Sequence, residues 1–193
     1  MPVSHPADAR ALLPDAIDRF TARVRAVDSH AWDAPTPCTA WPVRDLVAHL
    51  CSEHLWAPHV LAGEPLDAVG DRYSGDRFRD DPVGAWHRAA ARSRPCWTAT
   101  ATHADPVHTS FGPLAVAEYA EQMLLDLTVH EWDLARGAGL AEDLDPAGVD
   151  RALAYLRGDP IMLTGPGLFG EPVTAASPAS RDELLARLGR RVG

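Results

Sequence analysis

Residues 114–137 read LAVAEYAEQMLLDLTVHEWDLARG, which is the longest uninterrupted helical pattern in this chain of 193 residues. A turn, Phe111-Gly112-Pro113, precedes the pattern, and Gly137 closes it in the position of a C-terminal cap. The stretch therefore predicts one long helix from Leu114 to Arg136.

Shorter helical patterns lie on both sides of this stretch. Between Ala11 and Val27, apolar residues recur at spacings of three and four, which predicts an amphipathic helix. Prolines then interrupt the chain, and Pro42 is a favoured first residue for the next helix. We expect further helices over residues 42–61, 83–95, 145–156 and 181–188, a long surface loop over 63–82, and weak strand signals such as 106–110. The prediction is all-α: a bundle of four main helices with short appended helices and loops, in one domain over residues 1–193.

The composition is that of an ordinary globular protein, with 46% hydrophobic and 23% charged residues. Lys and Arg total 18 against 27 Asp and Glu, and the net charge of −9 argues against binding to nucleic acid or to an anionic membrane. Every cationic residue is arginine, so Schiff-base chemistry on lysine is excluded. No apolar run reaches the roughly 20 residues of a membrane helix, and the N-terminus lacks the layout of a signal peptide. We therefore expect a cytoplasmic protein.

Asp126 and His130 stand four residues apart in the long helix, so their side chains leave the same face one turn apart. Their neighbours are apolar, and a buried carboxylate and imidazole need partners. A metal ion would satisfy both, and His49, inside the second predicted helix, offers a third ligand. Two histidines and a carboxylate with one open position suit catalytic zinc, and also nickel or iron. The simpler alternative is an Asp–His salt bridge beside an unrelated histidine.

Other histidines and the cysteines are weaker candidates. His54 and His59 follow His49 at steps of five residues, which rotates each of them away from the face of the one before. The chain has neither a nucleophile elbow nor a phosphate-binding loop. Cys51 reads as a small core residue, and Cys38, in the proline-rich turn, reads as structural although a helix dipole could stabilise its thiolate.

Two charged residues could serve the same site indirectly. Asp133, three residues after His130, could orient that ring, or it could form a charge pair with Arg136 or Arg44. Arg44 is also a nominal candidate for binding a substrate carboxylate, with a capping or salt-bridge role as the alternative.

Two motifs carry a resemblance to a known family. They are Asp33-x-Pro-Thr-Pro-Cys38-x-x-Trp41-x-Val-Arg44-Asp45-Leu-x-x-His49-Leu and Asp126-x-x-x-His130-x-Trp132-Asp133-Leu-Ala135. Together they resemble the DinB-like superfamily, and more narrowly its actinobacterial metal-binding branch, related to the N-terminal domain of mycothiol-dependent maleylpyruvate isomerase. The likeness continues to Phe169-Gly-Glu-Pro-Val and to the closing Leu185-Ala-Arg-Leu-Gly189.

The resemblance implies a four-helix, up-down-down-up bundle with a divalent metal near one end. By the family's motif, the ligands match His49, Asp126 and His130, the same three residues that the spacing selects. Characterised relatives use the metal to activate a low-molecular-weight thiol, mycothiol or bacillithiol, for transfer or isomerisation.

This sequence departs from the family's pattern in three respects. Asp126 stands where the family usually has Glu, which shortens the ligand by one methylene group. Glu131 replaces what is commonly glycine and would add a charge beside the site. The sequence ends at Gly193, so we expect no counterpart of the isomerase's second domain, and the isomerase reaction itself is not carried over.

The leading hypothesis is a divalent-metal-dependent enzyme, with Zn²⁺ favoured over Ni²⁺ or Fe²⁺. It would activate a thiol of the mycothiol type for S-transfer or isomerisation on a small electrophilic molecule. The alternatives are a thiol-independent metalloenzyme, hydrolytic or biosynthetic, and a non-catalytic stress protein that binds a metal or another ligand. A structural ion would need a fourth protein ligand, for which His54 and His59 are the nearby candidates. We expect a monomer or a homodimer.

Overall fold

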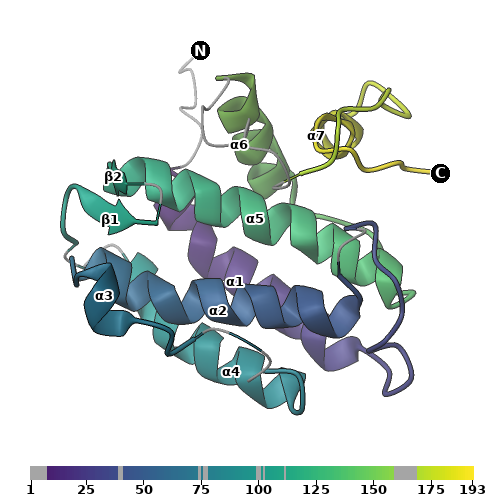
Figure 1. Cartoon of the computed structure of the whole chain (residues 1–193). Helices are drawn as coiled ribbons and strands as arrows, with labels where there is room; N and C mark the ends of the chain where they lie inside the picture. The colour runs from purple at the N-terminus through teal and green to yellow at the C-terminus, as the bar shows by residue number, and fades with distance from the viewer. Residues whose placement is uncertain are drawn as a thin grey trace.

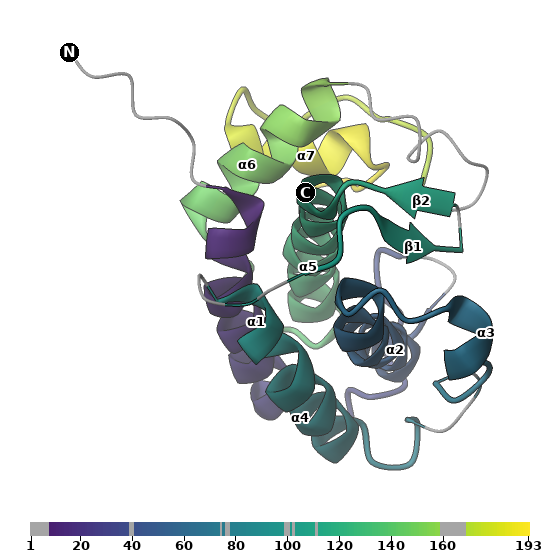
Figure 2. The same cartoon turned by 90° about the vertical axis from the view of Figure 1, so that its left-hand side faces the viewer.

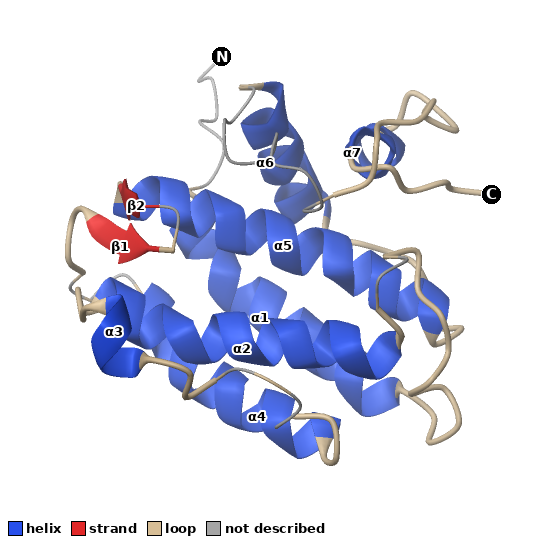
Figure 3. Ribbon diagram, viewed as in Figure 1, coloured by secondary structure: helices blue, strands red, loops and turns tan. Residues whose placement is uncertain are grey.

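A computed structural model of the protein describes residues 8–38, 41–73, 75, 78–98, 101, 103–110, 112–158 and 169–193. Within these ranges the α-helices are α1 (Ala9–Ala26), α2 (Val43–Leu61), α3 (Leu66–Val69), α4 (Pro82–Ser93), α5 (Val116–Gly137), α6 (Pro146–Arg157) and α7 (Ser180–Arg187). A short 3₁₀ helix, η1 (Arg94–Trp97), follows α4, and β1 (Val107–Thr109) pairs antiparallel with β2 (Gly112–Leu114). Helix dominates the molecule (Figure 3), which confirms the predicted all-α bundle. In the described ranges, no helix has the length and apolar character needed to cross a membrane.

Four long helices surround the main core (Figures 1 and 2). α1 packs along α5, α2 packs along α4, and α2 also contacts α5. Their apolar faces meet in one cluster, in which Leu13 and Trp86 are fully buried. A smaller cluster joins α5 to α6 and α7 through Leu125, Leu153 and Leu184. The two appended helices thus cover a further face of α5.

Side-chain caps and prolines set the starts of two helices. Asp81 accepts a hydrogen bond from the Gly84 amide at 2.9 Å at the start of α4. Asp145 accepts one from the Gly148 amide at 2.8 Å at the start of α6. Each helix also has proline in its first turn, where the missing amide hydrogen costs nothing.

The start of α2 is fixed by backbone contacts instead of a side-chain cap. The Val43 amide donates to the Ala34 carbonyl at 3.0 Å, and the Arg44 amide donates to the Trp32 carbonyl at 2.9 Å. These bonds satisfy first-turn amides that lack a partner inside the helix. They tie α2 to the segment that follows α1.

The region 63–82 differs from the predicted surface loop, because it contains the helix α3. Val69 and Tyr73 are 4% and 7% exposed, so this segment is anchored to the body of the protein by two apolar side chains. The surrounding Gly, Asp and Pro residues dominate its composition and hide that anchor in the sequence. The weak strand signal at 106–110 is confirmed as β1, and α4 ends before Pro95, as expected.

Gly137 is the last residue of α5 and not its cap, contrary to the prediction. The cap position is Ala138, and it is Gly139 that adopts the left-handed conformation, with φ +67°. Gly137 is needed for close packing: a Cβ there would lie 2.9 Å from Thr36 Cγ2 and 3.1 Å from the Pro35 carbonyl oxygen.

We expect Gly137→Ala to lower the free energy of unfolding by about 1–2 kcal/mol, because overpacking against the segment before α2 outweighs the gain in helix propensity. Urea unfolding followed by circular dichroism measures the change. Gly193→Ala is the control, since its Cβ would meet no atom within 4 Å. A Gly137→Ala protein as stable as the wild type would contradict the packing argument.

Candidate metal centre

Helices α2 and α5 bring together the three residues that the sequence singles out. His49 Nε2 lies 3.2 Å from Asp126 Oδ2, and His130 Nε2 lies 3.2 Å from Asp126 Oδ1. The two imidazole rings meet at 79°, with their centroids 5.5 Å apart. Asp126 therefore stands between the two histidines and offers one carboxylate oxygen to each.

The donor set fits a small divalent cation. One donor atom from each of His49, Asp126 and His130 lies within 4.8 Å of the other two. Two ligands bound at about 2.1 Å to a tetrahedral ion lie roughly 3.4 Å apart, close to the His–Asp separations here. In the described part of the chain, no fourth His, Cys, Asp or Glu joins this cluster. A cation held by these three residues would therefore have a position open for another ligand.

Burial and charge favour an ionised carboxylate at the centre. Burial raises the pKa of Asp126, but the neighbouring charges and hydrogen bonds of His130 and His49 outweigh it and hold that pKa well below its usual range. Burial lowers the pKa of His130, and the carboxylates of Asp126 and Asp133 more than reverse the effect. The side chains of His49 and Asp126 are 25% and 23% exposed, against 3% for His130, so the cluster can be reached from one side.

A buried ion pair of Asp133 with Arg190 contacts His130 at the ring nitrogen that does not face Asp126. His130 Nδ1 lies 3.0 Å from Asp133 Oδ2, so its N–H donates to that carboxylate and Nε2 is left facing Asp126. Arg190, which follows α7, donates to both oxygens of Asp133, at 2.8 Å and 3.2 Å. The side chains of Asp133 and Arg190 are 0% and 4% exposed. The sequence did not single out Arg190.

The predicted charge pair of Asp133 with Arg136 or Arg44 is wrong, because both arginines have other partners. Arg136 binds Glu142 at 2.8 Å, and Arg44 binds Asp33 at 2.7 Å, so neither is paired with Asp133. Arg44 also donates a hydrogen bond to a backbone carbonyl shortly before the start of α4. Of its predicted roles the structure shows the salt bridge, and Arg44 is not part of the cluster.

Trp41 and Cys38 complete the surroundings of the two histidines. The Trp41 ring stacks on His49 at 4.5 Å between centroids and is tilted against His130 at 5.8 Å. A donor atom of Cys38 lies within 4.8 Å of donors in His130 and Asp133. The proline-rich segment before α2 thus forms one wall of the site.

The remaining histidine candidates lie elsewhere. His54 is fully buried, and its Nδ1 lies 2.8 Å from the Ser93 hydroxyl on α4. His59 contacts Glu64 at 2.8 Å and the Tyr73 hydroxyl at 2.9 Å. Neither residue belongs to the cluster of His49, Asp126 and His130, so neither is placed there as a fourth ligand.

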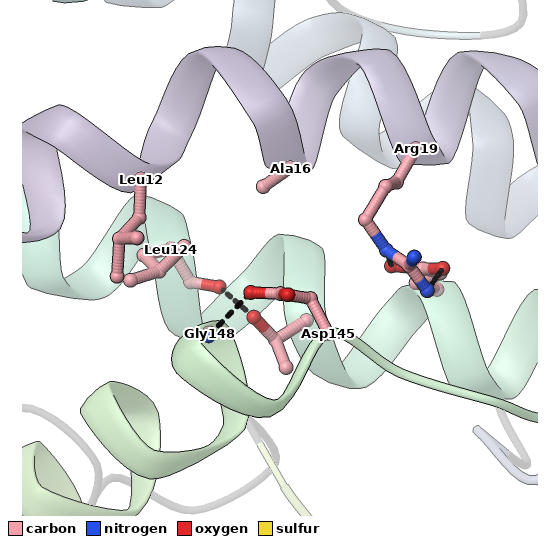
Figure 4. Close-up of a pocket in the computed structure, with 8 residues that line it drawn as sticks. Leu12, Ala16, Arg19, Leu124, Asp145 and Gly148 are labelled. Atoms are coloured by element: carbon pink, nitrogen blue, oxygen red, sulfur yellow. Dashed lines mark hydrogen bonds and ion pairs between the residues drawn. The ribbon is translucent and has the colours of Figure 1, made fainter.

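Glu131 also points away from the cluster and does not leave a free charge beside it. Its carboxylate accepts hydrogen bonds from Arg19 at 2.9 Å and from Arg23 at 3.3 Å, both on α1. Figure 4 shows Arg19 reaching from α1 toward α5, beside a cavity of about 10 Å³ that is too small for an organic ligand. The charge of Glu131 is balanced by the two arginines of α1 within the bundle.

The environment of His54 predicts a pH-dependent stability. Burial lowers its pKa to about 4, below the value of about 6.5 in an unfolded chain. The unfolded state therefore takes up the proton first, so the stability associated with neutral His54 is complete above pH 6.5 and is lost as the pH falls towards 4.

Between pH 7 and pH 5 this linkage amounts to about 2 kcal/mol. In metal-free protein, the loss of unfolding free energy over that interval should be smaller by this amount in His54→Gln than in the wild type. Urea titrations of both proteins at the two pH values measure the difference, and the contributions of the other histidines cancel. Parallel pH dependence in the two proteins would contradict a neutral, buried His54.

A comparison with known protein families matches the part of the chain that contains the cluster. Residues 13–135 match the model of the mycothiol maleylpyruvate isomerase N-terminal domain. The chain belongs to this family. Its members are in general metal-binding, and the matched region contains all three residues of the cluster as well as Asp133. Arg190 lies outside it.

The curated relatives do not add an activity. Two uncharacterised proteins of Mycobacterium tuberculosis, from strains CDC 1551 and H37Rv, are each 28% identical over 185 residues. The alignments cover 92% of this chain and 94% of each relative. No solved structure matches the chain.

Proposed function

We propose that this protein is a divalent-metal-dependent enzyme that activates a low-molecular-weight thiol for S-transfer to, or isomerisation of, a small electrophile. The observation that carries the proposal is the three-ligand cluster of His49, Asp126 and His130, open on one side. A divalent ion bound there, with Zn²⁺ favoured and Ni²⁺ or Fe²⁺ as alternatives, would supply the Lewis acidity that lowers the pKa of a coordinating thiol.

The chain's own residues have separate tasks in this proposal. His49 and His130 would present Nε2 to the ion, and Asp126 would contribute the negative charge. Asp133 holds the Nδ1 proton of His130, which keeps that ring in the tautomer a cation requires. Trp41 covers one side of the imidazoles and restricts water there. The exposed edges of His49 and Asp126 leave access for the thiol.

In S-transfer the thiol sulfur forms a bond to an electrophilic carbon, the bond from that carbon to its leaving group breaks, and the thiol proton passes to solvent. Mycothiol with 1-chloro-2,4-dinitrobenzene is a direct test, because the arylated thiol absorbs where the reactants do not. Zinc-loaded protein should accelerate the conjugation, chelator-treated protein should not, and added zinc should restore the rate.

The same assay separates the alternative activities. A rate that is independent of zinc would refute the metal-dependent enzyme. Metal-dependent turnover of an ester or amide panel without any thiol would favour the thiol-independent metalloenzyme. The three-ligand donor set gives the non-catalytic reading less support, since a purely structural ion is expected to have four protein ligands.

A further inference from the structure

A cavity of about 520 Å³ is lined by residues other than His49, Asp126 and His130. Its walls come from α2, α3, the hairpin β1–β2 and the first half of α5, and they include Glu53, Trp56, Asp67, Ser110 and Tyr119. Figures 1 and 2 show α3 and the hairpin near the same end of α2. The volume falls in the usual range for sites that take small organic molecules.

Glu53 is the feature of this cavity that most needs an explanation. Its side chain is half-buried in the wall of the cavity, and burial raises the pKa of its carboxyl group. Among the described residues it has no hydrogen bond or ion pair, although it lines the cavity. A half-buried carboxyl group that has no protein partner can accept a hydrogen bond from a ligand in the cavity.

The charges of the lining indicate which ligand would do so. Two acidic residues, Glu53 and Asp67, line the cavity together with Thr109, Ser110 and Tyr119. None of its described lining residues is cationic. A carboxylate or phosphate ligand would therefore meet like charge without a compensating arginine, whereas an ammonium group would find an acceptor.

We propose that this cavity binds an organic amine, with its ammonium group on Glu53 and its apolar part against Trp56. Trp56 offers an indole surface, and Val60 and Leu66 add aliphatic wall, so a ring or short alkyl chain would be desolvated beside the charge. The amine satisfies the unpaired carboxyl group and uses the apolar surface at once.

The cavity is placed to hold a substrate for the proposed reaction. Glu53 follows His49 by one helical turn on α2, and Gln122, also in the lining, precedes Asp126 by one turn on α5. One turn rises about 5.4 Å, so the ammonium end of a molecule anchored on Glu53 would lie nearest the cluster, with its apolar part directed away along α2. This role as substrate site rests on the proposed function, whereas binding of the amine does not.

Three probes of one shape test the charge preference: 2-phenylethylamine, neutral 2-phenylethanol and anionic 3-phenylpropanoate. Isothermal titration at pH 7 with chelator-treated protein, shown to be folded by circular dichroism, avoids binding of the anion to zinc. The amine should bind at least about tenfold more tightly than the alcohol, because a charge-assisted hydrogen bond is worth that much. The anion should bind most weakly.

Glu53→Gln keeps the shape of the side chain and should reduce the amine affinity to that of the alcohol. Asp71→Asn, at an exposed position outside the lining, makes the same change in net charge and should leave the preference intact. Anion binding equal to amine binding, or an unchanged amine affinity in Glu53→Gln, would overturn the assignment.

The two proposals fail separately. Repeating the amine titration with zinc-loaded protein, beside a zinc titration, distinguishes them. Amine preference in a protein that binds no zinc would support the cavity assignment and refute the proposed enzyme. Zinc binding without any amine preference would overturn the cavity assignment and leave the proposed enzyme standing.

Discussion

Replacing either His130 or His49 by alanine should reduce bound zinc from nearly one ion per chain to almost none. Each substitution removes one of the three donors of the cluster, and the two that remain would hold a divalent ion far more weakly than three. The loss of affinity should exceed the roughly 10- to 100-fold that removal of an outer-shell partner costs. Elemental analysis of protein purified without a metal-affinity tag measures the stoichiometry directly.

The control for this experiment is His30→Ala, which removes an exposed histidine far in sequence from the cluster. It should retain the wild-type zinc content. Thermal unfolding with and without zinc adds a second readout, because an ion that binds only the folded state raises the melting temperature. Zinc should stabilise the wild type and His30→Ala, but neither cluster variant. Equal zinc content in all four proteins would refute the three-ligand site.

The helices could be predicted because each carries its own local signal. The long helix that becomes α5 shows an uninterrupted pattern, and α6 has its proline and capping Asp145 at the predicted start. The helix α3 could not be predicted in this way. Val69 and Tyr73, which anchor its segment, are isolated apolar residues whose burial depends on partners distant in the sequence. Helix propensity depends on the residues of one segment, whereas burial depends on which segments pack together.

The candidate cluster was likewise predictable where its residues share one helix, and less so where it depends on a contact between helices. The spacing of Asp126 and His130 within one helix places them together, and the prediction that His49 faces them rests on a single contact between helices, which the structure provides. Their role as ligands stays a prediction. The direction of Glu131 was beyond a sequence argument, since nothing local says that α1 lies across from it with two arginines.

Arg190 and Glu53 show what local spacing misses. Arg190 lies 57 residues from Asp133, in a terminal segment with no periodic pattern that links the two. Glu53 looks like an ordinary charged residue in a helix, and only the fold shows that it lines a cavity together with α3 and the hairpin. In each case the informative property is the position of a charge relative to segments distant in the sequence, which only the assembled fold reveals.

Arg190→Met should destabilise the protein by about 3–5 kcal/mol, because it leaves the carboxylate of Asp133 buried without its arginine. Burial raises the pKa of Asp133, and its hydrogen bonds to His130 and Arg190 more than offset this, so the folded protein holds an ionised carboxylate whose charge must be balanced. Methionine keeps much of the apolar stem of arginine and removes the guanidinium group. Urea unfolding of metal-free protein gives the free energy.

Two further variants separate charge balance from simple loss of packing. Arg191→Met changes the adjacent, exposed arginine and should cost little. The double variant Asp133→Asn with Arg190→Met leaves no unpaired charge, so it should recover part of the stability that Arg190→Met loses. It should not recover zinc affinity, because a neutral amide is a weaker acceptor for the Nδ1 proton of His130.

These variants distinguish two roles for the ion pair of Asp133 and Arg190. As a support, the pair positions His130 for the ion, whereas as an anchor it only holds the terminal segment in place. An anchor alone would lower stability in Arg190→Met and leave zinc affinity per folded molecule unchanged. A support would weaken zinc binding by about 10- to 100-fold in Asp133→Asn even where the protein remains fully folded. Since Asp133 bonds both His130 and Arg190, we expect the second result, with the segment after α7 contributing to the geometry of a site on α2 and α5.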